Sequence, residues 1–249
     1  LRDVYKRQDL EGILTTHHDK DADVTMHLLN VADPRAFGCV PTDSNGRVTA
    51  FLEKTEDPPT NQINAGCYVF KRSVIESIPA NRVVSVERET FPGLLAEGRL
   101  VVGHVDNSYW RDMGRPDDFT RGSSDLVRGI APSPLIEGKT GESLVDPSAG
   151  IAGGVLLLSG TAVGRGSEVG AGSRLEGTVV FDGVRIEPGA IIHNSIIASG
   201  AHIGANAVIE NCVIGEGAHI GARCELLDGM RVFPGVSIPD AGVRFSSDA

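Results

Sequence analysis

An aliphatic residue returns every six positions through much of the second half of the chain. The series comprises Val163, Val169, Leu175, Ile186, Ile192, Ile203, Ile209, Ile214, Ile220, Leu226, Val232 and Ile238. Neither a helix, with about 3.6 residues per turn, nor a strand, with a period of about 2, produces such a repeat. A triangular coil does, because each six-residue side turns one aliphatic side chain into the prism. We therefore predict a left-handed parallel β-helix over residues 145–249, stabilised by contacts between successive coils.

Glycine follows many of these aliphatic residues, as at Gly164, Gly170, Gly204, Gly215 and Gly221. We expect these glycines to supply a permissive backbone at or near the corners. Five residues rather than six separate Ile209 from Ile214, and the stretches 179–184 and 192–203 are expected to carry small insertions. A disordered glycine-rich tail is the alternative, but disorder would not keep the aliphatic residues in phase.

Composition changes near residue 130. All five lysines lie at or before Lys139, the tryptophan and all three tyrosines lie before residue 112, and most glycines follow Gly141. The segment 130–141 holds two prolines and is typical of a linker. We expect a first domain over residues 9–129, a linker over 130–144 and the β-helix over 145–249.

The first domain alternates helical and strand patterns, which predicts an α/β sheet domain with an antiparallel excursion. Asp9 is a candidate N-cap for its first helix, Asn45-Gly46 predicts a hairpin, and Gly98 is expected to end a helix. The expected helices span 9–17, 73–78, 85–97 and a last one from Pro116, and the expected strands span 24–31, 38–41, 47–54, 63–71, 100–106 and 109–112.

Charge and cysteine usage exclude some classes of function. The net charge of -10 argues against a nucleic-acid partner, which requires clustered Lys and Arg. None of the four cysteines forms a CxxC pair, so we expect buried reduced thiols and a cytoplasmic protein. No apolar run approaches the roughly 18–20 residues of a membrane span, so we expect neither a membrane segment nor a signal peptide.

Three short strings could carry chemistry. In Glu53-Lys54 the carboxylate could accept hydrogen bonds from hydroxyls while the lysine binds a phosphate. Adjacent strand residues point to opposite faces, so both can reach one ligand only where the strand twists or ends. A solvated edge strand is the alternative, and the spacing alone favours it.

The second string is Asn64-Ala65-Gly66, in which the amide could bind hydroxyls and the glycine allows close backbone approach, although a bulge would also explain it. In the third, Trp110 to Pro116, Asp112 precedes an expected helix. It could either ligate Mg²⁺ or help to cap that helix. His193, His202 and His219 lie in the repeat, where a solvated coil face is favoured over catalysis.

Together these strings resemble the sugar nucleotidyltransferase family. The family pattern has a (Y/F)G step, an EK pair, an NAG strand and a W-x-D-x-G-x-P-x-x-(F/Y) segment. Here these are Phe37-Gly38, Glu53-Lys54, Asn64 to Gly66 and Trp110 to Phe119. The C-terminal β-helix is also a family feature. The resemblance runs from Asp9 to the C-terminus and is closest to mannose-1-phosphate guanylyltransferases of actinobacterial type.

The resemblance implies a partial Rossmann-like nucleotidyltransferase sheet followed by the β-helix. It implies that Lys54 contacts the sugar 1-phosphate, that Gly38, Glu53, Asn64 and Gly66 line the sugar site, and that Asp112 binds Mg²⁺. The implied substrates are GTP and mannose 1-phosphate, with no nucleic acid and no membrane as partner. The coil stack is expected to offer a surface for homo-oligomers.

Two departures from the family pattern stand out. Arg115 occupies a position where a small residue is commoner. The G-x-G-T-R loop that cradles the nucleotide in the family, with its following lysine and a second metal carboxylate, is absent from this sequence. Residues 1–8 do not match the family, and we expect a non-native leader there and an inactive N-terminally truncated chain.

Other functions remain open at this level. Glucose-1-phosphate thymidylyl-, adenylyl- or uridylyltransferases share the strings. Because the nucleotide loop is missing, a non-catalytic regulatory homologue is a further alternative. A hexapeptide acyltransferase using a β-helix histidine is disfavoured, because it has no need of the EK, NAG and W-x-D strings.

Overall fold

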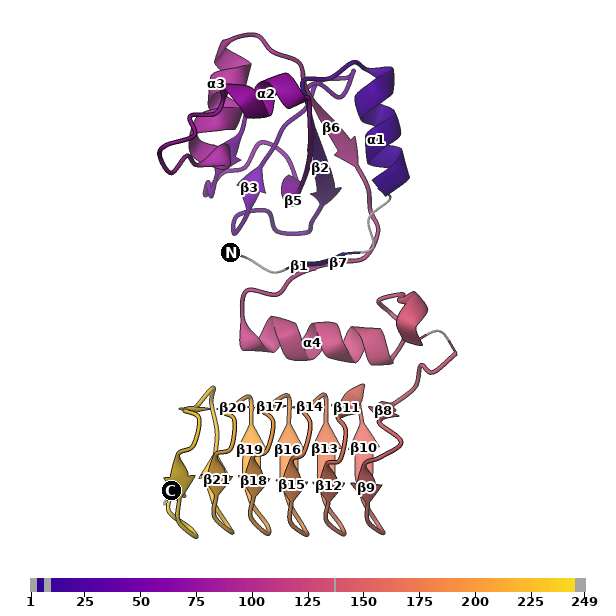
Figure 1. Cartoon of the computed structure of the whole chain (residues 1–249), viewed down its shortest axis with the longest axis vertical. Coiled ribbons are helices and arrows are strands. Elements are labelled where there is room, and N and C mark those ends of the chain that lie inside the picture. Colours follow the sequence, from indigo (N-terminus) through magenta and orange to yellow (C-terminus); the bar gives the residue numbers. More distant parts are fainter. Residues whose placement is uncertain (1–3, 7–9, 137, 245–249) are drawn as a thin grey trace. The chain divides into compact units, whose positions relative to one another are not determined.

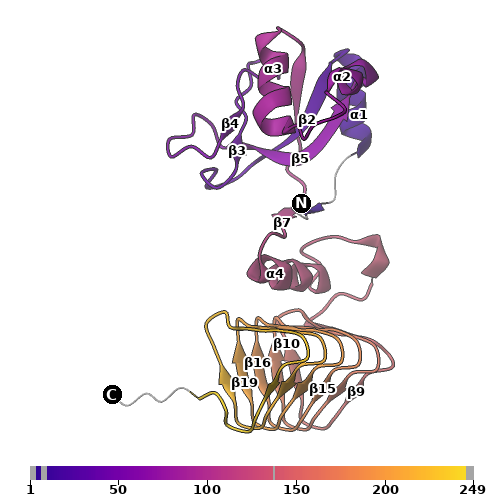
Figure 2. The same cartoon turned by 60° about the vertical axis from the view of Figure 1, so that its left-hand side comes forward.

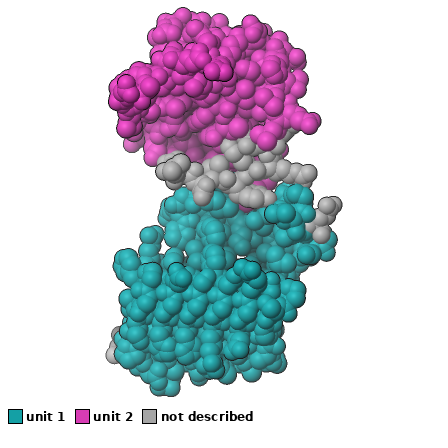
Figure 3. All heavy atoms as spheres, viewed as in Figure 1, with its two compact units in different colours: residues 1–5, 111–249 teal, residues 6–110 magenta. Residues whose placement is uncertain are grey.

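The computed structural model describes residues 4–6, 10–136 and 138–244. The chain divides into two compact units, residues 6–110, here called the sheet unit, and residues 1–5 with 111–249, here called the coil unit (Figure 3). Asp9, expected as an N-cap, and most of the expected leader at 1–8 lie outside the described residues. A two-stranded sheet pairs β1 (Val4–Lys6) with β7 (Trp110–Asp112).

The sheet unit is built on a five-stranded mixed sheet with the order β4-β3-β5-β2-β6 (Figure 1). Strand β2 runs parallel to β6 and antiparallel to β5, and β3 is antiparallel to both β5 and β4. This confirms the expected α/β domain with its antiparallel excursion. The elements are α1 (Leu10–Asp19), β2 (Val24–Asn30), β3 (Gly38–Cys39), β4 (Leu52–Glu53), β5 (Gln62–Phe70), α2 (Arg72–Ser77), a π-helix (Val86–Thr90), α3 (Phe91–Ala96) and β6 (Val101–Val105).

Helices cover both faces of this sheet. Val24 and Met26 of β2 pack in one cluster with Phe91 of α3. The side chain of the intervening Thr25 is hydrogen-bonded to His17 of α1, with 2.9 Å between Thr25 Oγ1 and His17 Nδ1. Because neighbouring side chains on a strand point to opposite faces, α1 and α3 lie on opposite sides of β2. The first six residues of β2 are all buried, as expected of a strand covered on both faces.

The strands on either side of the expected hairpin are shorter than the sequence pattern indicates, and the first retains only Gly38–Cys39. The expected strand 47–54 retains only Leu52–Glu53, because Val48 turns to β6 and donates its N–H to the Val101 carbonyl at 2.8 Å. The hairpin is present as a single bridge between Thr42 and Val48, with Gly46 at φ 77°.

The expected helix 85–97 is two elements, a π-helix (Val86–Thr90) followed by α3 (Phe91–Ala96). Pro92 lies at the junction and has no N–H to donate back into the preceding turn. Gly98, at φ 72°, follows the end of α3 as expected.

The coil unit is a parallel β-helix of three sheets with five, six and six strands (Figures 1 and 2). This confirms the fold predicted from the six-residue period. The strands are β8 (Ser143–Val145), β9 (Gly150–Ile151), β10 (Leu156–Leu158), β11 (Thr161–Val163), β12 (Glu168–Val169), β13 (Arg174–Glu176), β14 (Val179–Val180), β15 (Arg185–Ile186), β16 (Ile191–His193), β17 (Ile196–Ile197), β18 (His202–Ile203), β19 (Val208–Glu210), β20 (Val213–Ile214), β21 (His219–Ile220), β22 (Glu225–Leu226), β23 (Arg231–Val232) and β24 (Ser237–Ile238).

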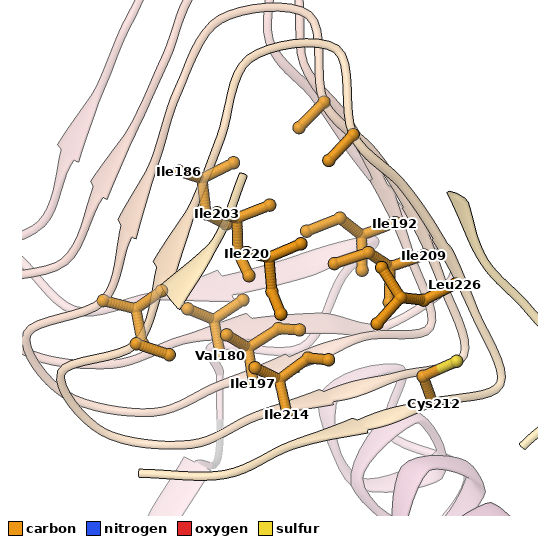
Figure 4. Close-up of a cluster of buried hydrophobic side chains, with 14 of the residues drawn as sticks. Val180, Ile186, Ile192, Ile197, Ile203, Ile209, Cys212, Ile214, Ile220 and Leu226 are labelled. Carbon is orange, nitrogen blue, oxygen red and sulfur yellow. The ribbon is translucent and has the colours of Figure 1, made fainter. Parts of the chain in front are cut away.

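The predicted aliphatic residues form the core of the prism in three columns, one for each side (Figure 4). One column comprises Val180, Ile197 and Ile214, the second Ile186, Ile203 and Ile220, and the third Ile192, Ile209 and Leu226. Each of these side chains is buried. A column of matched side chains is the packing that lets identical coils stack.

The insertions expected at 179–184 and 192–203 are not present, and that prediction is wrong. Val180 and Ile197 occupy the same ladder, 17 residues apart, and Ile214 continues it. The five-residue step from Ile209 to Ile214 therefore recurs in successive coils. Its corner carries a left-handed residue, Asn194 at φ 46° and Asn211 at φ 55°, which closes the turn with one residue fewer.

The role expected for the glycines that follow the core aliphatics also needs correction. Gly204 does not have a left-handed backbone, but a Cβ placed on it would lie 2.4 Å from the backbone nitrogen of Ala222 in the next coil. Gly170 and Gly221 meet the next coil in the same way, at 2.5 Å and 2.4 Å. These glycines are required because the coils stack closely, whereas left-handed glycines such as Gly166 and Gly200 lie elsewhere in the turns.

Helix α4 (Pro116–Val127) belongs to the coil unit, although the sequence pattern places it in the first domain. Phe119 stacks on Phe181 with ring centroids 6.3 Å apart. The Ser124 hydroxyl donates to the Ser159 carbonyl at 2.7 Å. These contacts with the coils move the boundary between compact units to residues 110–111. A short 3-10 helix (Pro134–Ile136) lies in the expected linker.

None of the described helices is long and apolar enough to cross a membrane.

Replacing Gly204 with alanine should lower the free energy of unfolding by about 1–3 kcal/mol, since the new methyl group would overlap the next coil. Thermal unfolding followed by circular dichroism measures the effect. Gly153→Ala is the matched control, because a Cβ at Gly153 meets nothing within 4 Å and should leave the melting temperature unchanged. Equal melting temperatures for both variants would contradict the close-stacking explanation.

Stability should also fall as the pH drops below about 6.5. Burial lowers the pKa of His17 below its ordinary value of 6.5, and the neighbouring His18 and Lys71 act in the same direction. The unfolded chain therefore binds a proton that the folded chain resists, so acid favours unfolding. Urea denaturation between pH 7.5 and pH 5.5 measures this. His17→Gln can retain a bond to Thr25 without titrating and should flatten the pH dependence, whereas exposed His18→Gln should flatten it less, because burial, the largest cause of the shift, remains.

Candidate functional site

Five of the six residues singled out from the sequence lie in the sheet unit, on the strands β3, β4 and β5 or directly after β4. Gly38 of β3 pairs directly with Glu53 of β4, and Lys54 follows at once. Asn64 and Gly66 lie on β5, which is bonded to β3 on one side and β2 on the other. Asp112 belongs to the coil unit.

The local backbone removes the objection that Glu53 and Lys54 should point to opposite faces. Strand β4 ends at Glu53, and Lys54 adopts a left-handed conformation with φ 41°. Such a conformation is uncommon for a residue with a Cβ and costs energy that the surrounding structure must offset. Lys54 is exposed and forms no ion pair with any described residue. Its ammonium group is therefore available to a phosphate.

Gly38 keeps room for the Glu53 carboxylate. A Cβ at Gly38 would lie 3.2 Å from Glu53 Oε2 and 3.2 Å from the ring of Phe51. A larger side chain would push the carboxylate away, so the glycine of the Phe37-Gly38 step fixes where Glu53 can lie.

Asn64 organises an irregular stretch of β5. Opposite β2 the register moves from Tyr68 beside Met26 to Asn64 beside Leu28, so residues 65–67 bulge out of the ladder. The Asn64 Oδ1 accepts the Gly66 N–H at 3.0 Å, inside this bulge. Gly66 is exposed at φ 76°, and a Cβ there would meet nothing within 4 Å. The glycine therefore serves the backbone conformation at this point and leaves open space in front of it.

The other half of the Asn64 amide binds two residues that the sequence analysis did not single out. Its Nδ2 donates to the Tyr68 hydroxyl at 2.6 Å and to Glu87 Oε1 at 2.9 Å. Burial raises the pKa of Tyr68 to about 12, and the nearby carboxylates of Glu87 and Glu53 add to the increase. Glu53 and Glu87 thus both act on Tyr68, although they come from β4 and the π-helix. π-helical turns are frequent at functional sites.

The W-x-D segment contributes to the sheet unit through its tryptophan. Trp110 Nε1 donates to the Ala65 carbonyl at 3.2 Å, and its ring packs edge-on against Phe37 with centroids 5.6 Å apart. Trp110 therefore supports the bulge that carries Asn64 and Gly66.

Asp112, at the other end of that segment, is half buried at the end of β7. A Cβ at Gly114 would lie 3.3 Å from Asp112 Oδ1, so this glycine leaves room beside the carboxylate. The residues that the structure describes contain no group of three or more His, Cys, Asp or Glu able to hold a metal. Mg²⁺ commonly uses only one or two carboxylates together with phosphate oxygens and water, which a single aspartate can fit.

Comparison with known proteins identifies the family to which this chain belongs. Residues 2–129 match the family model described as nucleotidyl transferase, and residues 139–243 match the one described as GMPPB C-terminal domain. The chain belongs to the nucleotidyl transferase family.

Within this family the chain is similar to proteins named as mannose-1-phosphate guanylyltransferases. It is 62% identical to the Mycobacterium tuberculosis protein of that name over 99% of this chain and 69% of the relative. It is 35% identical to mannose-1-phosphate guanylyltransferase 1 of Arabidopsis thaliana over 70% of this chain, which spans 49% of that relative. A putative mannose-1-phosphate guanyltransferase of Sulfolobus acidocaldarius is 29% identical over 67% of this chain. The resemblance stated from the sequence is thereby confirmed.

Glu87 lies in the string Val84-Ser85-Val86-Glu87, which the sequence pattern indicated only as a helix start. Its distance of 23 residues from Asn64 along the chain offers no pattern that would connect them. The contact depends on the π-helix and on the bulge in β5, and neither has a signature in the three short strings.

Glu87→Gln should lower the pKa of Tyr68, because removal of a nearby negative charge makes the phenolate less unfavourable. Ultraviolet titration of the tyrosines measures this change. Glu89→Gln is the matched control, since Glu89 lies two residues away and pairs with Arg82 at 2.7 Å. If both variants leave the last tyrosine transition where it was, the Asn64–Tyr68–Glu87 cluster is incorrect.

Proposed function

We propose that this chain carries the sugar-phosphate side of an enzyme that transfers GMP from GTP to mannose 1-phosphate, giving GDP-mannose and pyrophosphate. The observation that carries the proposal is the juxtaposition of Glu53 and Lys54 at the end of β4 beside Gly38. A carboxylate next to an ammonium that forms no ion pair with a described residue, at a strand end, suits a ligand with both hydroxyls and a phosphate. The similarity to mannose-1-phosphate guanylyltransferases supports the choice of mannose and guanosine.

The roles follow from what each group can do. Lys54 binds the phosphate of mannose 1-phosphate as a point charge. Glu53 accepts hydrogen bonds from sugar hydroxyls, and the exposed Gly66 lets the sugar approach the backbone. Asn64, whose amide is bonded to Gly66, Tyr68 and Glu87, holds this surface in place and can still present its second Oδ1 lone pair to a hydroxyl.

In the reaction an oxygen of the sugar phosphate forms a bond to the α-phosphorus of GTP. At the same time the bond between that phosphorus and the oxygen that bridges the α- and β-phosphates breaks. Pyrophosphate leaves with the electron pair of that bond. The protein contributes by positioning both phosphates and neutralising their charge, since no covalent intermediate is needed.

Asp112 is the residue of this chain that we assign to Mg²⁺. When bound, the ion neutralises charge on the phosphates in the transition state. The room beside Asp112 left by Gly114 supports the assignment.

A cytoplasmic location is part of the proposal, because all four cysteines are free thiols, as expected in a reducing compartment. Homo-oligomers formed through the coil stack also remain a proposal.

The enzyme activity should be tested in a protein that joins this chain to a G-x-G-T-R nucleotide segment. GTP and mannose 1-phosphate should give GDP-mannose and pyrophosphate, detected by chromatography, and other nucleoside triphosphates or glucose 1-phosphate should react more slowly. The chain by itself should release no pyrophosphate, because it lacks that loop.

In the same protein, Lys54→Ala should raise KM for mannose 1-phosphate at least tenfold, because hydrogen bonds to charged groups contribute about 1.5–3 kcal/mol. KM for GTP should change much less. Lys71→Ala is the control, because Lys71 is already paired with Asp21 at 2.7 Å. An unchanged KM for mannose 1-phosphate would contradict a role of Lys54 in binding and would favour the alternative of a solvated edge strand.

A further inference from the structure

A cavity of about 340 Å³ lies within the coil unit, between the start of α4 and the coils. It is lined by Arg115, Pro116, Asp117 and Arg121 from the helix side and by Asn211, Val213, Gly229 and Arg231 from the coil side. None of these residues takes part in the proposed sugar-phosphate site. We propose that this cavity is a second anion site that binds the phosphate group of a small phosphorylated metabolite.

The charge of the lining supports an anion. Three arginines and one aspartate line it, a net charge of +2 in a chain whose net charge is -10. Arg115 is 3.4 Å from Asp117, and both side chains are at least half exposed. Within the described residues, Arg121 and Arg231 form no ion pair. Two arginines from separate elements are therefore free to bind one ligand, and arginine matches phosphate in a bidentate way.

Helix α4 adds to this potential. It is 12 residues long and its N-cap, Arg115, provides no side-chain hydrogen bond to the first turn. The unsatisfied N–H groups and the positive end of the helix dipole therefore add to the arginines around the cavity. The Asn211 side chain supplies amide donors from the opposite wall.

Two larger cavities lined by described residues lack this excess of positive charge. The cavity of about 520 Å³ around Val163 is lined by Arg165 and Lys139, but Arg165 is paired with Asp182 at 2.9 Å, and Asp146 is also present. The cavity at Glu168 and Glu187 has two carboxylates and one arginine, Arg185, which is paired with Glu187.

The proposal also accounts for Arg115, which the sequence comparison marked as a departure from the family pattern. Arg115 is one of the residues that line the anion cavity in the coil unit. The volume exceeds what a single phosphate needs, which leaves space for an organic group beside Pro116 and Val213.

Isothermal titration calorimetry on the whole chain carrying Lys54→Ala tests the proposal, because that change removes the proposed phosphate contact of the sheet unit. Inorganic phosphate and pyrophosphate are titrated at constant ionic strength, with chloride as the non-binding anion. We expect saturable binding of at least one of them. Adding Arg121→Gln and Arg231→Gln should weaken it at least tenfold.

The matched control adds Arg128→Gln and Arg223→Gln instead. These changes remove the same two charges from α4 and the coils, and both side chains are exposed outside the cavity. Thermal unfolding verifies that both variants are folded. Equal loss of binding in the two variants, or the absence of saturable binding in the millimolar range by the folded parent, would overturn the proposal. This result does not depend on the guanylyltransferase proposal, which is tested separately by the formation of GDP-mannose and by KM for mannose 1-phosphate.

Discussion

The central strand β5 has to leave its ladder between Asn64 and Tyr68, and the candidate site depends on that interruption. A regular strand would point the side chains of residues 64–68 alternately to its two faces and leave no exposed backbone between them. The bulge instead exposes Gly66, and the Asn64 side chain closes it by accepting the Gly66 N–H and donating to Tyr68 and Glu87. A partly buried amide with so many partners is costly to disturb, because removing a partner leaves a polar group without its hydrogen bond.

The same interruption connects elements that are distant in the sequence. Trp110 supports the bulge through the Ala65 carbonyl, and the π-helix brings in Glu87 from its other side. Glu53 and Lys54 lie across β3 from β5, where β4 ends at Glu53 and the left-handed Lys54 follows. Two local departures from regular strand geometry, one on β4 and one on β5, therefore produce the surface assigned to the sugar phosphate.

The sequence was most informative where the structure is periodic. The inward residues of the coils could be predicted because each aliphatic position has the same environment as the position one coil away. The reason for Gly204 could not be predicted, because the distance between coils has no counterpart within one hexad. The packing of α4 on the coils could not be predicted either, because Phe119 and Ser124 contact coil residues far along the chain. In the sheet unit the strings indicated Gly38, Glu53, Asn64 and Gly66 as neighbours, but Glu87 required the tertiary register.

The central claim is that the ends of β3, β4 and the bulge of β5 form one binding surface for a sugar phosphate. Two-dimensional ¹H–¹⁵N NMR of the chain during titration with mannose 1-phosphate tests it most directly. We expect saturable shifts of the backbone amides of Gly38, Lys54 and Gly66, which mannose without phosphate should reproduce only weakly. Shifts confined to other parts of the sheet unit, with these three amides unmoved at saturation, would contradict it.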